Sequence, residues 1–170
     1  MKETLLERHR LFPYINTHAH LETYSKGRSL LAPLYWSYSE AASMDEAYAP
    51  MYSNTEYLFG KHFIVAPITE PLEVATAKRL WLPPGLWVNW RKPSQVFHGP
   101  KELVLENLKL SDSPVFVNSS AIIPIQTDVE SSNIPHQAFP IIDPAVWVMF
   151  PSSGATIASG ELFEDDGKTM

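Results

Sequence analysis

The chain of 170 residues contains no cysteine, which excludes disulfide bonds and thiolate metal sites. It lacks any apolar run near the roughly 20 residues that a membrane-spanning helix needs, and no signal-peptide segment follows Met1. Positive charge is also scarce, because the net charge is −6 and no long basic run occurs. These absences predict a cytoplasmic protein that has neither a membrane nor a nucleic acid as its partner.

Glycine is scarce as well, with seven residues against fifteen prolines. Proline is expelled from helix interiors and central strands, so this ratio predicts short elements joined by many corners. Hydrophobic residues make up 45% of the chain and charged residues 19%, which is enough apolar material for a packed core. The length fits one domain, or a small domain with an appendage.

The first 27 residues carry a helical pattern that spans residues 3 to 26 and stops at Gly27. Pro13 interrupts this pattern and predicts a kink, because it removes one helical hydrogen bond. Four apolar residues fall within roughly 80° of one another on a helical wheel and predict a buried stripe, namely Leu5, Phe12, Ile15 and Ala19.

After Gly27 the pattern changes to short β-type runs separated by Pro, Gly and Asn, which predicts a mainly β fold, an antiparallel β-sandwich preceded by one N-terminal helix. The predicted strands are Ser29–Trp36, Glu56–Phe59, His62–Thr69, Ala75–Leu82, Leu86–Trp90, Gln95–Phe97, Glu102–Glu106, Pro114–Val117 and Ala121–Gln126. A helical turn is predicted within Glu40–Tyr48.

A polar loop from Asp128 to Ile134 predicts a boundary, beyond which Val146–Phe150 and Ala155–Phe163 are predicted as two further strands. Asp166-Gly167 is a strong hairpin signal. Only three residues follow it, too few for a stable returning strand. We therefore expect the chain to stop within a structure.

The stretch PYINTHAHLE raises the possibility of a metal site at His18 and His20. In a strand both imidazoles would share one face and could bind one ion. In a helix, residues two apart point about 200° away from each other, and no pair here has the spacing of three or four residues that chelation needs. The continuous helical pattern favours the second interpretation, and a metal-dependent hydrolase using His18 and His20 remains an alternative.

Two other groups of side chains have a functional interpretation. The acidic cluster of Glu161, Glu164, Asp165 and Asp166 lacks the ligand spacing of a calcium loop, and adjacent residues on a turn provide no cleft for glycoside cleavage. Four tryptophans could form a stacking platform for sugar rings or belong to a core, namely Trp36, Trp81, Trp87 and Trp90. A stand-alone carbohydrate-binding module is therefore a further alternative.

Several blocks resemble, in the same order, the C-terminal part of glycoside hydrolase family thirty-one, the retaining α-glucosidases and α-xylosidases. RHRLFPYINTHAH is similar to the last helix of the family's catalytic barrel. SLLAPLYWSY, NTEYLFGKHFIVAPIT, WLPPGLWVNW and SPVFVNSSAIIPIQ resemble its proximal β-sandwich. ELFEDDGKT resembles the opening hairpin of its distal β-domain.

The resemblance implies three parts: residues 1–27 as the terminal barrel helix, 28–127 as the proximal β-sandwich and 128–170 as the start of a truncated distal β-domain. The family's catalytic aspartates lie on barrel segments that would precede Met1. The resemblance therefore implies a fragment that supports a glycosidase barrel and is inactive alone, with no catalytic, cofactor-binding or metal-binding residue of its own. Its expected partners are the missing barrel, a second copy through the helix, and weakly a carbohydrate.

Overall fold

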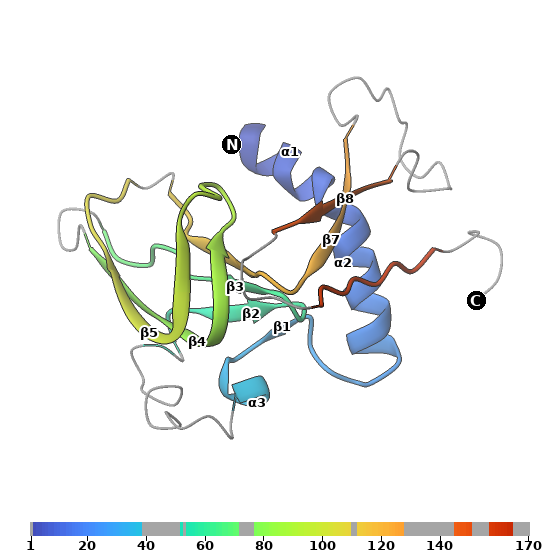
Figure 1. Cartoon of the computed structure of the whole chain (residues 1–170), viewed down its shortest axis with the longest axis horizontal. Helices are drawn as coiled ribbons and strands as arrows, with labels where there is room; N and C mark the ends of the chain where they lie inside the picture. The colour runs from blue at the N-terminus through green and yellow to red at the C-terminus, as the bar shows by residue number, and fades with distance from the viewer. Residues whose placement is uncertain are drawn as a thin grey trace. The chain divides into compact units, whose positions relative to one another are not determined.

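The computed structural model describes residues 2–38, 52, 54–71, 77–109, 112–127, 145–150 and 157–164 (Figure 1). The helices are α1 (Lys2–Arg10), α2 (Phe12–His18), the π-helix η1 (Ala19–Tyr24) and α3 (Tyr35–Tyr38). The strands are β1 (Leu31–Ala32), β2 (Tyr57–Phe59), β3 (Phe63–Val65), β4 (Lys78–Asn89), β5 (Val96–Leu105), β6 (Val115–Asn118), β7 (Ile122–Gln126) and β8 (Ala145–Met149). The described part is thus mainly antiparallel β, and the predicted fold class is confirmed.

The chain divides into two compact units, one formed by residues 30–119 and the other by residues 1–29 together with 120–170. Among the described residues of the first unit, six strands form one sheet in the order β1-β2-β3-β6-β4-β5. Every pair in this sheet is antiparallel. One buried cluster contains side chains from most of the strands and from the segments before β2, and its members are Leu34, Tyr52, Leu58, Ile64, Ala66, Leu80, Trp81, Leu82, Trp87, Leu103 and Phe116.

The long β4–β5 hairpin dominates this sheet (Figure 1). The sequence predicted two strands on either side of Pro83-Pro84, but β4 runs through both prolines. A register shift between Leu82 and Gly85 marks a β-bulge there, which is where a strand tolerates prolines without losing its partner. The indole Nε1–H of Trp87 donates to the carbonyl oxygen of Pro83 at 2.8 Å and fixes the bulge.

The N-terminal helix is confirmed, with the interruption that Pro13 predicted. α1 ends at Arg10 and α2 begins at Phe12, so that Pro13 lies in the first turn of α2, where its missing N–H is harmless. Gly27 has a φ of +65°, and the N–H of Arg28 donates to the carbonyl oxygen of Glu22 at 2.7 Å. This left-handed glycine ends the helix, as the sequence indicated.

The helix buries a different face from the one predicted. Tyr14, Thr17 and His18 are buried, and α2 packs on β7. Leu5 is 51% exposed and Phe12 is 37% exposed, whereas Ile15 and Ala19 are half-buried, so the predicted stripe is covered only in part. Tyr14 and His18 are large rings one helical turn apart, and their burial orients the helix.

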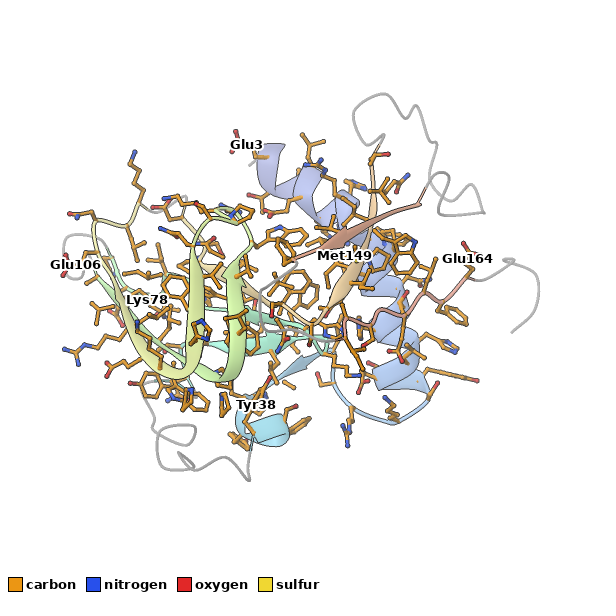
Figure 2. All side chains as sticks on the ribbon, in the orientation of Figure 1. Glu3, Tyr38, Lys78, Glu106, Met149 and Glu164 are labelled. Atoms are coloured by element: carbon orange, nitrogen blue, oxygen red, sulfur yellow. The ribbon has the colours of Figure 1, made fainter. Side chains whose placement is uncertain are left out.

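β7 and β8 form a two-stranded antiparallel sheet in the same unit as α1, α2 and η1 (Figure 1). The predicted strand Val146–Phe150 is confirmed as β8, in which Met149 lies near the end (Figure 2). The predicted strand Ala155–Phe163 is wrong over its described residues, because they make only one isolated bridge, between Ser159 and Ala121. A Cβ on Gly160 would overlap the backbone of Ile122, so this close approach requires the glycine.

The predicted strand Ser29–Trp36 is also wrong beyond the two residues of β1. The carbonyl oxygens of Pro33 and Leu34 accept from the N–H groups of Trp36 and Ser37 at 3.2 and 3.1 Å, which begins the short helix α3. Proline favours such a helical start because its φ is already helical. The helical turn predicted in Glu40–Tyr48 and the hairpin at Asp166-Gly167 lie outside the described residues. None of the described helices is both long and apolar enough to traverse a bilayer.

Candidate functional site

His18 and His20 lie in a helical segment, and their rings have separate surroundings. His18 closes α2 and is buried against Tyr14, with the ring centroids 4.2 Å apart. His20, in η1, stacks on Phe163 with centroids 3.6 Å apart and planes at 8°. Across the described residues, no three His, Cys, Asp or Glu side chains are grouped as a metal site would require. The geometry does not favour the metal-dependent alternative.

The four tryptophans do not form a common platform. Trp81 and Trp87 are buried in the core of the sheet. Trp90 contacts Phe63 edge to face, with centroids 5.1 Å apart, whereas Trp36 is 55% exposed. Two of the rings therefore contribute to stability and cannot stack on a sugar, so the carbohydrate-binding module is not favoured either.

Of the acidic cluster, Glu161 and Glu164 are exposed, and Asp165 and Asp166 lie outside the described residues. Glu164 is at the end of the described C-terminal segment (Figure 2). The two described carboxylates, of Glu161 and Glu164, are not assigned a catalytic role.

The structure reveals a buried carboxyl that the sequence reasoning missed, that of Glu56 just before β2. Glu56 is only 2% exposed, and both of its carboxyl oxygens lie 3.2 Å from the backbone nitrogen of Trp81, whose N–H donates to them. Nothing in the local sequence marks this residue, because Glu56 is the first residue of the predicted strand Glu56–Phe59 and follows the polar Asn54-Thr55, where a charged side chain is usually exposed.

The surroundings of Glu56 shift two pKa values. Burial raises the pKa of Glu56 to about 8, although the hydrogen bond from Trp81 and the charge of Lys78 act in the opposite direction. Burial lowers the pKa of Lys78, against the charges of Glu56 and Glu70, and its Nζ donates to the carbonyl oxygen of Pro67 at 2.9 Å. Both effects follow from the cost of holding a charge away from water.

This arrangement is unsuited to glycoside hydrolysis, which uses two carboxyl groups facing each other across the bond to be broken. Glu56 is enclosed in the core and points at a backbone amide, so it cannot reach a substrate. Its perturbed pKa reflects burial in the scaffold and not a catalytic pair.

Comparison with known proteins identifies the family to which this β-rich domain belongs. Residues 27–123 match the glycosyl hydrolase family 31 C-terminal domain. The chain is 28% identical over 126 residues to a 1,6-alpha-glucosyltransferase of Sporosarcina globispora, an alignment that covers 74% of this chain and 9% of that protein. It is 26% identical over 172 residues to the neutral alpha-glucosidase AB of Mus musculus, which covers 100% of this chain and 16% of that protein.

A family 31 dextranase of Flavobacterium johnsoniae shares the fold, with a TM-score of 0.70, 24% identity and coverage of 89% of this chain and 17% of that chain. The chain thus spans between 9% and 16% of the length of the relatives that it matches in sequence. The family match covers more than half of the chain, and the β-rich unit that it spans is the one found in the structure. The chain therefore belongs to glycosyl hydrolase family 31.

Proposed function

We propose that this chain is the C-terminal β-domain part of an α-glucosidase- or α-xylosidase-type enzyme, in which a separate catalytic barrel hydrolyses terminal α-glycosidic bonds. The observation that carries the proposal is the match of residues 27–123 to the family's C-terminal domain. The relatives support it, since one is named a neutral alpha-glucosidase and another a 1,6-alpha-glucosyltransferase.

Within such an enzyme the chain acts as a scaffold and not as the site of catalysis. A retaining glycosidase needs two carboxyl groups about 5 Å apart on either side of the substrate. In the described part of residues 30–119, the core is filled by large apolar side chains, and its buried acid is bonded to a backbone amide. The catalytic aspartates belong to the barrel, which is the principal partner of this chain.

The division into parts is also a proposal. Residues 1–27 act as the terminal barrel helix, 28–127 as the proximal β-sandwich and 128–170 as the start of a distal β-domain. The β-rich unit of residues 30–119 supports the middle assignment, although β7 packs with the helices. The cytoplasmic location inferred from the composition stays a prediction, as does a weak carbohydrate contact, for which Trp36 is the exposed member of its group.

The experiment that tests this function is an assay of the purified chain with a chromogenic α-glucoside and a chromogenic α-xyloside. We expect no turnover of either substrate, because the chain carries no pair of opposed carboxyl groups in its described core. A complete family 31 α-glucosidase assayed in parallel shows that the substrates and conditions are sound. Turnover that co-migrates with the chain through successive purification steps would contradict the scaffold role.

A further inference from the structure

The N-terminal half of β4 is paired on one side only among the described residues. On one side, β4 pairs with β5 from Lys78 to Val88. On the other side, β6 reaches only Trp87, Val88 and Asn89. No described strand pairs with the backbone groups of Lys78–Leu82 that point away from β5, and leaving such groups unpaired in a core is costly.

Glu56 provides the partner for Trp81 at this edge. The N–H of Trp81 points to the carboxyl group of Glu56, whose two oxygens are both 3.2 Å from the nitrogen. The residues on both sides of this bond are buried, since Trp81 is fully enclosed and Glu56 is 2% exposed. A side chain from the segment before β2 thus takes the place of a neighbouring strand.

Two charged groups act around this bond, one on β4 itself and one in the loop after β3. The positive charge of Lys78, which lies on β4, lowers the pKa of Glu56 and so favours its ionised form. Figure 2 labels Lys78. Its Nζ is bonded to the carbonyl oxygen of Pro67 and not to the carboxyl group. The negative charge of Glu70, in the loop after β3, raises the pKa of Lys78. Lys78 is therefore shared between two acids and compensates the charge of Glu56 only in part.

We propose that Glu56 is a protonation-controlled latch that fastens the residues directly before β2 to the edge of β4 that no described strand covers. The latch is closed while the carboxyl group is neutral and loosens when it ionises. The neutral acid still accepts the N–H of Trp81 through its carbonyl oxygen and leaves no charge in the core. The ionised acid accepts the same bond but must remain desolvated, which favours opening of the edge to water.

The direction of the pH effect follows from the pKa of Glu56, which is about 8 in the folded chain against an ordinary value of 4.5. Between these two values the folded state holds a proton that the unfolded state has released. The contribution of Glu56 to the free energy of unfolding is therefore largest below about pH 4.5. It falls as the pH rises and levels off above about pH 8. Within that window the unfolding equilibrium constant increases by up to about tenfold per pH unit.

The test is amide hydrogen exchange of the full chain, followed by NMR between pH 5 and pH 9 and expressed as protection factors. We expect the protection factor of the Trp81 amide to fall through this range in the wild type and to stay constant in Glu56→Gln, which keeps the acceptor and cannot ionise. The amide of Trp90, bonded to the carbonyl oxygen of Val115 at 2.9 Å, is the comparison within the same unit. Equal pH dependence of the Trp81 amide in the wild type and in Glu56→Gln would overturn the proposal.

A second measurement does not depend on the folding of a variant. Carboxyl ¹³C shifts of glutamate-labelled wild type report the ionisation of Glu56 directly, and we expect a midpoint near 8. A midpoint near 4.5 would overturn the latch.

The same measurement on Lys78→Met tests the role of the neighbouring charge. We expect the midpoint of Glu56 to move to a higher pH, because the positive charge that favours ionised Glu56 is removed. An unchanged midpoint would contradict the arrangement of charges described above.

Discussion

Gly99, on β5, lies opposite the bulge of β4, in register with Gly85. A Cβ at this position would overlap the carbonyl oxygen of Pro83 and lie 2.8 Å from that of Leu82. Both neighbours are backbone atoms, which cannot rotate away as a flexible side chain can. The glycine is therefore required by the close approach of the two strands.

We predict that Gly99→Ala lowers the free energy of unfolding by about 1–3 kcal/mol, which is the usual cost of forcing extra atoms into a packed site. Urea denaturation followed by tryptophan fluorescence measures the loss, because Trp81 and Trp87 are in the same core. Gly27→Ala makes the same chemical change where no atom lies within 4 Å of the added Cβ, so it carries only the strain of a positive φ, about 1 kcal/mol. An unchanged free energy of unfolding in Gly99→Ala would show that the two strands move apart and relieve the clash.

Thr17 links helix α2 to the C-terminal segment 157–164 of the same unit. Its hydroxyl donates to the carbonyl oxygen of Pro13 at 2.7 Å and accepts the N–H of Phe163 at 3.0 Å. The ring of Phe163 stacks on His20, one turn further along the helix. One buried hydroxyl thus helps to hold this segment, which pairs with other described residues through a single β-bridge.

We predict that Thr17→Val loosens this segment and lowers the stability of its unit by about 1–3 kcal/mol, because the N–H of Phe163 loses its acceptor at nearly constant side-chain volume. The amide of Phe163 should exchange faster in Thr17→Val than in the wild type. Thr17→Ser keeps the hydroxyl and serves as the matched control. Unchanged exchange at Phe163 in the valine variant would show that the segment is held by other contacts.

The exposed apolar residues of the helix bear on the assembly of the whole protein. Leu5, on α1, is 51% exposed, and Phe12, the first residue of α2, is 37% exposed. In the proposed enzyme we expect the barrel to cover these two side chains. Without a barrel we propose that the chain self-associates, because apolar side chains in water gain free energy when they are buried against one another.

Sedimentation velocity over a range of protein concentrations tests this proposal. We predict concentration-dependent assembly of the wild type and a shift toward monomer in the double variant Leu5→Glu with Phe12→Glu. Val104→Glu is the control, since Val104 is similarly exposed, at 50%, but lies on β5 in the other unit. A wild type that stays monomeric at every concentration would contradict self-association through the helix.

The patterns in the sequence predicted the class of fold and several of its helices and strands correctly. The helix between residues 3 and 26, its break near Pro13 and its end at Gly27 all depend on interactions between neighbours in sequence. The same holds for β8 and for the short runs that became β2, β3 and β6. The resemblance to family 31 rested on the order of several such blocks, and the family match confirmed it.

What the sequence by itself determined is therefore local: mainly β structure, one N-terminal helix, and a helical placement of His18 and His20 that does not favour a shared metal. Only the tertiary structure decided which face of the helix is buried, that β4 passes through Pro83-Pro84, and that Glu56 lies inside the core. The reason is physical. Helical and strand periodicity depend on nearby residues, whereas the burial of a polar group depends on partners such as Trp81, which is 25 residues away in the sequence.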